Sequence, residues 1–385
     1  MAKICCITTL EGTMREFVIP AMELFVRDGH KVTLMCNMSD SFIKEFSDRF
    51  HCINVKMHKG INIKDLITKP FEFYSKFRQE EFDYVQYATI NASVYSCIPA
   101  WITKIPHRVC CKWGMDFHVK KGLTRFLYRQ IEKFPCRFAN HISIPSRKNQ
   151  LLGANNGLYK LSQSSVVGDG GTVGVDLATF NYDLRERYKE QVLIEHPELK
   201  GKLVFGFLGR IYKDKGVNEL LEAFLSLKNQ DKYALLIIGP FDNSRQSLKP
   251  DLLQRAKENP NIIFHGFTKE VPKYLSAIDV LCHPSYHEGF SMAIQQAMAM
   301  GCAIVTTDVP GPSEVIENGI SGITVASMDS KALADGMMQM TDDNLRKEFI
   351  SAALERVKSK FSRDRMIKLT YENRKDIING KYDSH

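Results

Sequence analysis

The chain has 385 residues, 44% hydrophobic and 25% charged, which is ordinary for a globular protein and predicts two domains rather than one core. No apolar run approaches the roughly 18 residues of a membrane-spanning helix, and the opening MAKICCITTL predicts a buried strand instead of a signal peptide. The net charge of +8 lies entirely in residues 1–180, and residues 101–150 alone hold 11 basic and 2 acidic side chains.

Short β-rich runs alternate with stretches of helical period, such as 14–28 and 216–229. The first series of runs lies at 3–9, 31–36, 82–87, 108–112 and 141–144, and the second at 203–209, 234–239, 261–266, 278–284 and 303–308. This alternation predicts two α/β domains with doubly wound parallel sheets. We expect an N-terminal domain over 1–180, a polar linker over 181–201, a C-terminal domain over 202–362, and a final helix and tail over 363–385 that could pack back on the N-terminal domain.

Several common sites are disfavoured. The first β-turn, TTLEGTMRE, holds one glycine, and GDGGTVG (168–174) misses the G-x-G-x-x-G spacing, so a nicotinamide-dependent dehydrogenase is not expected. The chain holds no Walker pattern and no D-x-D triplet, so neither a P-loop nor a metal clamp on a diphosphate is expected. The ten cysteines form no C-x-x-C motif, which predicts free thiols in a reducing compartment.

Two motifs follow predicted strands of the second half. In GRIYKDKG (209–216), Gly209 allows close backbone approach, while Arg210 and Lys215 suit a diphosphate, although two cations in a loop could equally be solvated. In HGF (His265, Gly266, Phe267) the backbone could face a planar base, although a histidine there is more often a packed residue.

A third motif, HPSYHEGFSMAIQQAMAMG (283–301), places Glu288 and Gly289 between a strand and a helix. Amide groups and the dipole at a helix start favour negative ligands, but a glutamate there could be only a first-turn residue. Gln296 lies eight residues later on nearly the same helix face, in a segment otherwise rich in Ala, Met and Ile.

Together these motifs, with the sequence that joins them through TTDVPGPSEVI, resemble the donor half of a retaining family 4 glycosyltransferase of the GT-B fold, in which two Rossmann-like domains face each other across a cleft. The resemblance is close over 203–325 and weaker in the first half, where GVDLATF (174–180) is similar to the segment before the family's linker. It implies that Glu288 binds sugar hydroxyls and that Arg210 and Lys215 neutralise the donor diphosphate. The implied donor set also contains Gly12, Gly209, Gly289 and Phe290, and Gln296 stands where the family has a second, ribose-binding Glu.

The first half departs from the family as well. Trp113-Gly114 replaces the usual His-Gly, and Asp116 and His118 in the following MDFH are candidate polar groups for sugar or acceptor, with packing as the alternative for His118. In KKGLTRFLYRQIEKFPCRF, one cationic stripe contains Lys121, Arg125, Arg129 and Lys133 at helical spacing. Such a helix suits an anionic membrane surface, or is a solvated face; no nucleic-acid motif accompanies it.

The sequence therefore predicts a metal-independent GT-B glycosyltransferase without a cofactor. The resemblance implies a reaction that moves a hexose or N-acetylhexosamine from a UDP-sugar to a saccharide on a polyprenyl diphosphate, in surface polysaccharide or O-antigen synthesis, with retention. The expected location is cytoplasmic, peripheral on the inner face of the cell membrane. Two alternatives are a non-hydrolysing UDP-sugar epimerase and a non-catalytic subunit of a glycan-synthesis complex.

Overall fold

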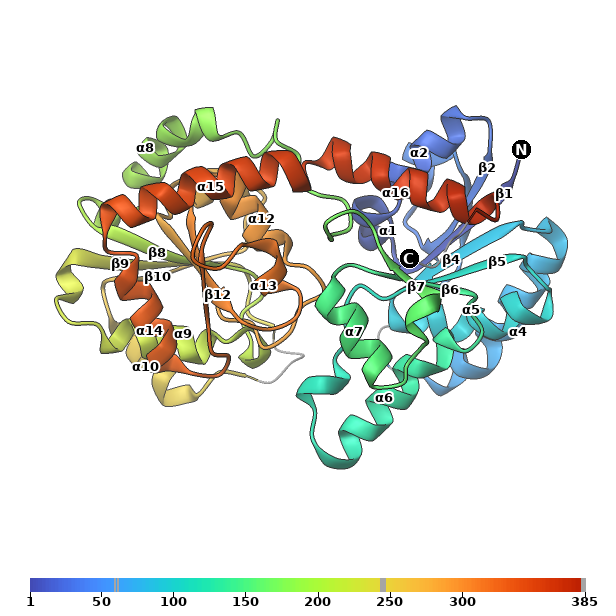
Figure 1. The fold of residues 1–385 in the computed structure, drawn as a ribbon, viewed down its shortest axis with the longest axis horizontal. Coiled ribbons are helices and arrows are strands. Elements are labelled where there is room, and N and C mark those ends of the chain that lie inside the picture. The colour runs from blue at the N-terminus through green and yellow to red at the C-terminus, as the bar shows by residue number, and fades with distance from the viewer. Residues whose placement is uncertain (59, 61, 243–246, 382–385) are drawn as a thin grey trace. The chain divides into compact units, whose positions relative to one another are not determined.

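The computed structural model of the protein describes residues 1–58, 60, 62–242 and 247–381 (Figure 1). The chain divides into two compact units. Unit 1 contains Met1–Val173 together with the residues from Asp364 onward, and unit 2 contains Gly174–Arg363. The division between the units therefore falls a few residues before the boundary expected at residue 180.

Unit 1 is built on a seven-stranded parallel sheet in its described residues, in the order β3-β2-β1-β4-β5-β6-β7. The strands are β1 (Lys3–Leu10), β2 (Lys31–Asn37), β3 (His51–Asn54), β4 (Tyr84–Ala88), β5 (His107–Cys111), β6 (His141–Ile144) and β7 (Ser164–Val166). The helices are α1 (Glu11–Phe17), α2 (Ile19–Arg27), α3 (Asp40–Phe46), α4 (Ile63–Glu80), α5 (Ile90–Ile102), α6 (Gly122–Cys136), α7 (Arg147–Asn155) and, from the end of the chain, α16 (Arg363–Ile378).

Both faces of this sheet are buried, as a sheet covered by crossover helices requires. Successive side chains of a strand point to opposite faces, and the adjacent cysteines follow that rule. Cys5 and Cys110 belong to one hydrophobic core, and Cys6 and Cys111 belong to the core on the other face. All ten cysteines are free, which confirms the expectation of unpaired thiols.

Unit 2 repeats this plan with a six-stranded parallel sheet in its described residues, in the order β10-β9-β8-β11-β12-β13. The strands are β8 (Leu203–Leu208), β9 (Tyr233–Ile238), β10 (Ile262–Gly266), β11 (Val280–His283), β12 (Ala303–Thr307) and β13 (Ile323–Val325). The helices are α8 (Arg185–Glu195), α9 (Val217–Ser226), α10 (Pro250–Glu258), α11 (Val271–Ser276), α12 (Met292–Ala299), α13 (Pro312–Val315), α14 (Ser330–Gln339) and α15 (Asp343–Phe361).

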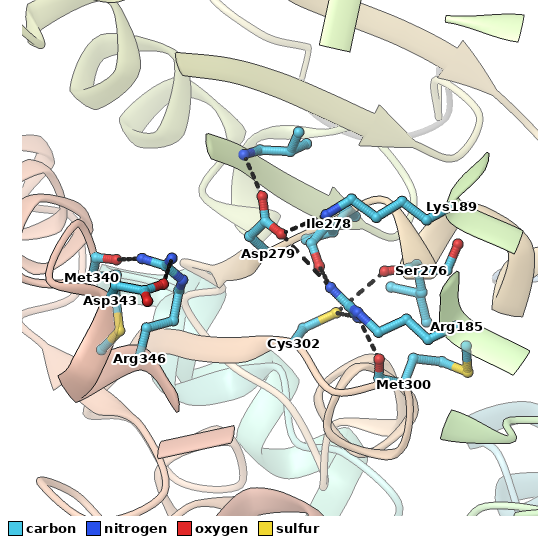
Figure 2. A network of polar contacts seen from close by, with 12 residues as sticks. Arg185, Lys189, Ser276, Ile278, Asp279, Met300, Cys302, Met340, Asp343 and Arg346 are labelled. Carbon is cyan, nitrogen blue, oxygen red and sulfur yellow. Dashed lines mark hydrogen bonds and ion pairs between the residues drawn. The ribbon is translucent and has the colours of Figure 1, made fainter. Parts of the chain in front are cut away.

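Residues 181–201, which the sequence analysis expects as a linker, belong to unit 2 and contain α8. Figure 2 shows the contacts that hold this helix. The buried Arg185 donates hydrogen bonds to the carbonyl oxygens of Met300 and, at 2.8 Å, of Ile278. Lys189 reaches Asp279 at 3.1 Å. A buried arginine that satisfies backbone carbonyls fixes α8 to the sheet, so the segment is part of the domain.

The last helix, α16, packs within unit 1. Arg374 is 4% exposed and donates to the hydroxyl of Ser143, on β6, at 2.7 Å. Tyr371 hydrogen-bonds to the carboxylate of Asp28, and its ring lies 4.7 Å from that of Phe25 on α2. Unit 1 is therefore assembled from both ends of the chain.

Candidate active site

The candidate site of unit 2 lies where the strand order reverses. β8 pairs with β9 on one side and with β11 on the other, so the loops that follow β8 and β11 leave the same edge of the sheet in opposite directions. Open α/β sheets bind their ligands at this switch point. The two motifs GRIYKDKG and HPSYHEG occupy these two loops.

A glycine brings the two loops into contact. Gly216 has a φ of +70°, and a side chain there would place its Cβ 2.0 Å from the carbonyl oxygen of Pro284. Only glycine tolerates this approach. The same contact is held by the backbone, because the amide of Tyr286 donates to the carbonyl oxygen of Asp214 at 2.9 Å. These contacts place Lys215 beside the loop that contains Glu288.

Lys215 and Glu288 form an ion pair at the centre of the site. The lysine ammonium donates to Oε1 of Glu288, and the same oxygen accepts a hydrogen bond from the hydroxyl of Ser285 at 3.2 Å. The Nε2 atom of His283 also lies 3.2 Å from it. The lysine side chain is 16% exposed and the glutamate side chain 19% exposed, so the pair is largely shielded from water.

This arrangement keeps both members charged. Burial raises the pKa of Glu288, but the Lys215 ammonium and the His283 ring oppose it, and the net pKa lies well below the usual range of a glutamate. Burial lowers the pKa of Lys215, but the charge of Glu288 outweighs it and the net pKa is raised. The site therefore holds an ionised carboxylate as a hydrogen-bond acceptor, beside a fixed positive charge.

Arg210 lies in the same loop but on its exposed side. Its guanidinium pairs with the carboxylate of Asp242 at 2.5 Å and stacks over the ring of Tyr212, 5.4 Å from the ring centroid. The Arg210 side chain is 53% exposed. Both predicted diphosphate-binding cations therefore stand at one loop.

The helix that follows Glu288 starts with a serine cap. The hydroxyl of Ser291 accepts from the amide of Ile294 at 3.4 Å and lies 3.2 Å from Nε2 of His283. Gln296 is half-buried. The fully buried neighbour Gln295 donates to the carbonyl oxygen of Ser291 at 3.2 Å. The role of Gln296 at a ribose stays a prediction.

The Gly289-Phe290 dipeptide is held by packing. The ring of Phe290 lies 5.3 Å from that of Phe361 and belongs to the hydrophobic core. Gly311, with a φ of +94°, lets the loop after β12 approach so closely that a Cβ atom would lie 2.8 Å from the carbonyl oxygen of Glu288. The Phe290 side chain is thus a core residue, and any part it takes in donor binding belongs to its backbone.

The HGF motif ends β10 at the same edge of the sheet. The His265 ring lies 3.7 Å from that of Tyr274, and its Nδ1 lies 3.3 Å from Nε2 of His196. Burial, and then the neighbouring His196, lower the pKa of His265. Gly266 has a φ of +85°, and Phe267 is 70% exposed. The His265 side chain is therefore packed against other side chains, which is the alternative that the sequence left open. The contact of the motif's backbone with a planar base stays a prediction.

The candidate residues of the first half lie in unit 1. Gly12 stands in α1, directly after β1, with open space where a side chain would project. Asp116 and His118 lie in the segment after β5, where Asp116 is the N-cap of a short 3-10 turn, Phe117–Val119, that contains His118. That loop is anchored by Glu132 of α6, whose Oε1 accepts from the amides of Asp116 at 2.8 Å and Phe117 at 3.1 Å.

The predicted cationic stripe lies on α6 and at its N-cap, Lys121. Residues 121–128 are all exposed, so Lys121 and Arg125 face solvent, whereas Arg129 and Lys133 are half-buried. The latter two approach Gly157, with their terminal nitrogens 3.7 and 3.9 Å from an ideal Cβ position there. Among the described residues, no helix is both long and apolar enough to cross a bilayer.

Three residues that build these sites were not predicted from the sequence. His283 and Ser285 contact Glu288, and both lie inside the HPSYHEG segment at the end of a predicted strand, where polar side chains could have been noticed. Glu132 is 3% exposed and lies 3.8 Å from the ammonium of Lys112. The sequence does contain a clue to Glu132, because it is the single acidic residue of the otherwise basic helix α6.

The chain is similar to known proteins in sequence and in fold. Residues 189–356 match the family model "Glycosyl transferases group 1". The capsular polysaccharide biosynthesis glycosyltransferase CapM of Staphylococcus aureus is 28% identical over 293 residues, which are 74% of each chain. The N,N'-diacetylbacillosaminyl-diphospho-undecaprenol alpha-1,3-N-acetylgalactosaminyltransferase of Campylobacter jejuni is 25% identical over 301 residues, 75% of this chain and 77% of the relative.

The solved structure of Anabaena Alr3699/HepE in complex with UDP and glucose has the same fold, with a TM-score of 0.77, 17% identity, and coverage of 98% of this chain and 100% of that one. The two parallel-sheet domains therefore define a protein of the GT-B class. The family match over most of unit 2 and the two relatives show that the protein is a glycosyltransferase.

Proposed function

We propose that the enzyme moves a hexose or an N-acetylhexosamine from a UDP-sugar to a saccharide carried on a polyprenyl diphosphate, during synthesis of a surface polysaccharide. The acceptor class is supported by the Campylobacter jejuni relative, which is named for a diphospho-undecaprenol acceptor, and the pathway class by CapM. The donor nucleotide is supported by the HepE structure, which contains UDP. Retention of anomeric configuration is proposed from the family 4 resemblance.

The observation that carries the proposal is the pairing of Lys215 with Glu288 at the switch point of unit 2. Negative charge develops on the nucleoside diphosphate as it leaves. In this proposal side chains, and not a metal, neutralise that charge. Lys215 and Arg210 take that role, and each charge-assisted hydrogen bond contributes about 1.5–3 kcal/mol. Glu288, kept ionised, accepts hydrogen bonds from sugar hydroxyls. The ammonium of its partner Lys215 then neutralises the negative charge of either the Glu288 carboxylate or the leaving diphosphate.

The acceptor side belongs to unit 1 in this proposal. The loop with Asp116 and His118 supplies polar groups for the acceptor sugar, and the exposed cations of α6 contact anionic headgroups at the membrane surface. An amphipathic cationic helix gains about 1 kcal/mol for each basic residue near an anionic surface.

The test is an assay with a panel of UDP-sugars, with and without an undecaprenyl-diphosphate saccharide. The proposal expects sugar transfer only when acceptor is present, and proton NMR of the product should show the anomeric configuration of the donor. An epimerised UDP-sugar formed without acceptor would assign the protein to the epimerases. UDP binding without turnover on any acceptor would make it a non-catalytic subunit.

A further inference from the structure

Unit 1 exposes apolar side chains on a second helix besides α6. On α4, Ile63 is 74% exposed, Ile67 61% and Phe71 73%. These three residues repeat every four positions and so form one stripe on the helix surface. The core-facing side of α4 is a different one, because Phe73 and Phe77 are fully buried. α4 is therefore apolar on two sides, and only one of them is used by the fold.

Further apolar side chains of unit 1 line a groove or are exposed. Leu66 of α4 lines a groove of about 330 Å³ with Ile90 and Val94 of α5 and with Ile131 and Phe134 of α6. Of the 22 large apolar side chains that are exposed in the described chain, ten lie on α4, at Ile90, or on α6. The α6 members are Leu123, Phe126, Leu127 and Tyr128. A concentration of exposed apolar side chains of this kind marks an interaction site.

The charged residues beside these apolar side chains indicate which kind of partner the surface binds. The exposed residues of the first turns of α4 and α6 include the cations Lys64, Lys121 and Arg125, and residues 63–71 and 121–128 contain no exposed carboxylate. The single acid of these segments, Asp65, is 2% exposed and accepts from the amide of His58 at 2.9 Å. The next acid of α4, Glu72, pairs with Lys69 at 2.9 Å. Apolar side chains interspersed with cations match acyl chains beneath anionic headgroups.

We infer that α4 and α6 form a two-helix platform that inserts its apolar side chains into an anionic bilayer leaflet, with the groove between them receiving a hydrocarbon chain. The inference rests on the proposed function, which assigns membrane contact to α6 alone, and adds α4 as a second anchoring element. The platform is defined by Ile63, Leu66, Ile67 and Phe71 of α4 and by Leu123, Phe126 and Leu127 of α6.

The first test is partitioning onto vesicles of phosphatidylglycerol and phosphatidylcholine. Ile67→Glu with Phe71→Glu should lower the partition coefficient at least tenfold, because each buried side chain of this size contributes at least a tenfold factor. Ile194→Glu, at a residue of α8 that is 77% exposed, is the matched control and should bind as the parent does. Both variants should keep parental turnover on a water-soluble acceptor, which shows that they are folded.

The second test reports insertion directly. Phe71→Trp and Leu127→Trp should each gain fluorescence that vesicles with acyl-chain bromines quench, whereas Ile194→Trp should not. Quenching of Leu127→Trp alone would overturn the inference and leave membrane docking by α6 in place.

Two further outcomes separate the inference from the function on which it rests. If Lys121→Glu with Arg125→Glu detaches the protein while the α4 double variant binds as the parent, α4 is no anchor and the proposed function stands. If the parent itself fails to bind vesicles, both membrane assignments fall, while transfer to a soluble acceptor still tests the enzyme. A parent dimer that Ile67→Glu dissociates would overturn the inference by making the surface a protein interface.

Discussion

Lys215 and Glu288 lie 73 residues apart in the chain, yet their charges meet at the reversal of the strand order of unit 2. One follows β8 and the other follows β11, and these neighbouring strands send their loops to opposite sides. The pair is shielded from water, and the charge of each member offsets the cost of burying the charge of the other. Function and stability are therefore coupled at this point of the molecule.

The first prediction concerns that coupling. Glu288→Gln should lower transfer at least about 100-fold, because it removes an ionised acceptor of sugar hydroxyls. It should also destabilise unit 2 by about 1–3 kcal/mol, since Lys215 loses its partner. Glu186→Gln, at an exposed residue of α8, is the control. In denaturant unfolding, a cycle with Lys215→Met should give a coupling energy of about 0.5–3 kcal/mol. Strict additivity would mean that the pair contributes nothing to stability.

The second prediction separates the two cations. Arg210→Ala and Lys215→Ala should both weaken UDP binding, measured by calorimetry, because each removes a charge from the predicted diphosphate site. Only the lysine variant should lose stability, since the Arg210 side chain is 53% exposed and surface ion pairs contribute about 0–1 kcal/mol. Arg255→Ala, on the exposed side of α10, is the matched control. Unchanged UDP affinity in both variants would place the diphosphate elsewhere.

The third prediction concerns pH. The folded pKa of Glu288 lies below its unfolded value, so the folded state binds fewer protons and stability is lost as pH falls. The loss should begin near the unfolded pKa of about 4.3 and continue below it. Unfolding free energies measured between pH 6 and pH 3 should therefore fall less steeply in Glu288→Gln than in the parent. A parallel fall would show that other carboxylates govern acid unfolding.

The fourth prediction is metal independence. The chain holds no D-x-D triplet to clamp a metal on the donor diphosphate, and Lys215 and Arg210 can supply positive charge in its place. Transfer should therefore persist at its full rate in EDTA, measured as UDP release with acceptor present. Activity that disappears in EDTA and returns with Mn²⁺ or Mg²⁺ would contradict this.

The fifth prediction concerns the exposed part of the α6 stripe. Binding to anionic vesicles should weaken as salt rises, because exposed charges are screened within about 8–10 Å at physiological ionic strength. Lys121→Glu with Arg125→Glu should detach the protein, while Lys200→Glu with Lys228→Glu, an equal charge change on unit 2, should not. Turnover on a short soluble acceptor should survive. Salt-independent binding would assign the anchoring to apolar contacts alone.

The interior strands and the class of fold could be predicted because buried parallel strands are continuous apolar runs, here of four to seven residues. All ten predicted runs correspond to strands of the structure. The three strands that were not predicted, β3, β7 and β13, have three or four residues each and lie at sheet edges, where the apolar signal is short. The stretch 14–28 is divided at Val18 into α1 and α2, with Pro20 in the first turn of the second helix.

The site could be located only in part. The motifs GRIYKDKG and HPSYHEG identify the loops, but their contact depends on the strand order, which no local pattern contains. The pairing of Lys215 with Glu288 follows from that contact, whereas the pairing of Arg210 with Asp242, which lies after β9, follows from the pairing of β8 with β9. The exposure of Ile63, Ile67 and Phe71 on α4 could not be predicted either, because apolar side chains at helical spacing predict burial, and which side of the helix the fold covers depends on the packing of unit 1.

The division of the chain has a consequence for its synthesis on the ribosome. Unit 2 is one uninterrupted segment, Gly174–Arg363, whereas unit 1 needs α16, which is translated last. Until α16 emerges, the sheet of unit 1 lacks the buried Arg374 beside Ser143, although its strands were the first to be made. Domains are usually completed in the order of their translation, and here the order is reversed. A stop codon shortly after residue 363 would therefore remove part of the first domain's interior, and not a dispensable tail.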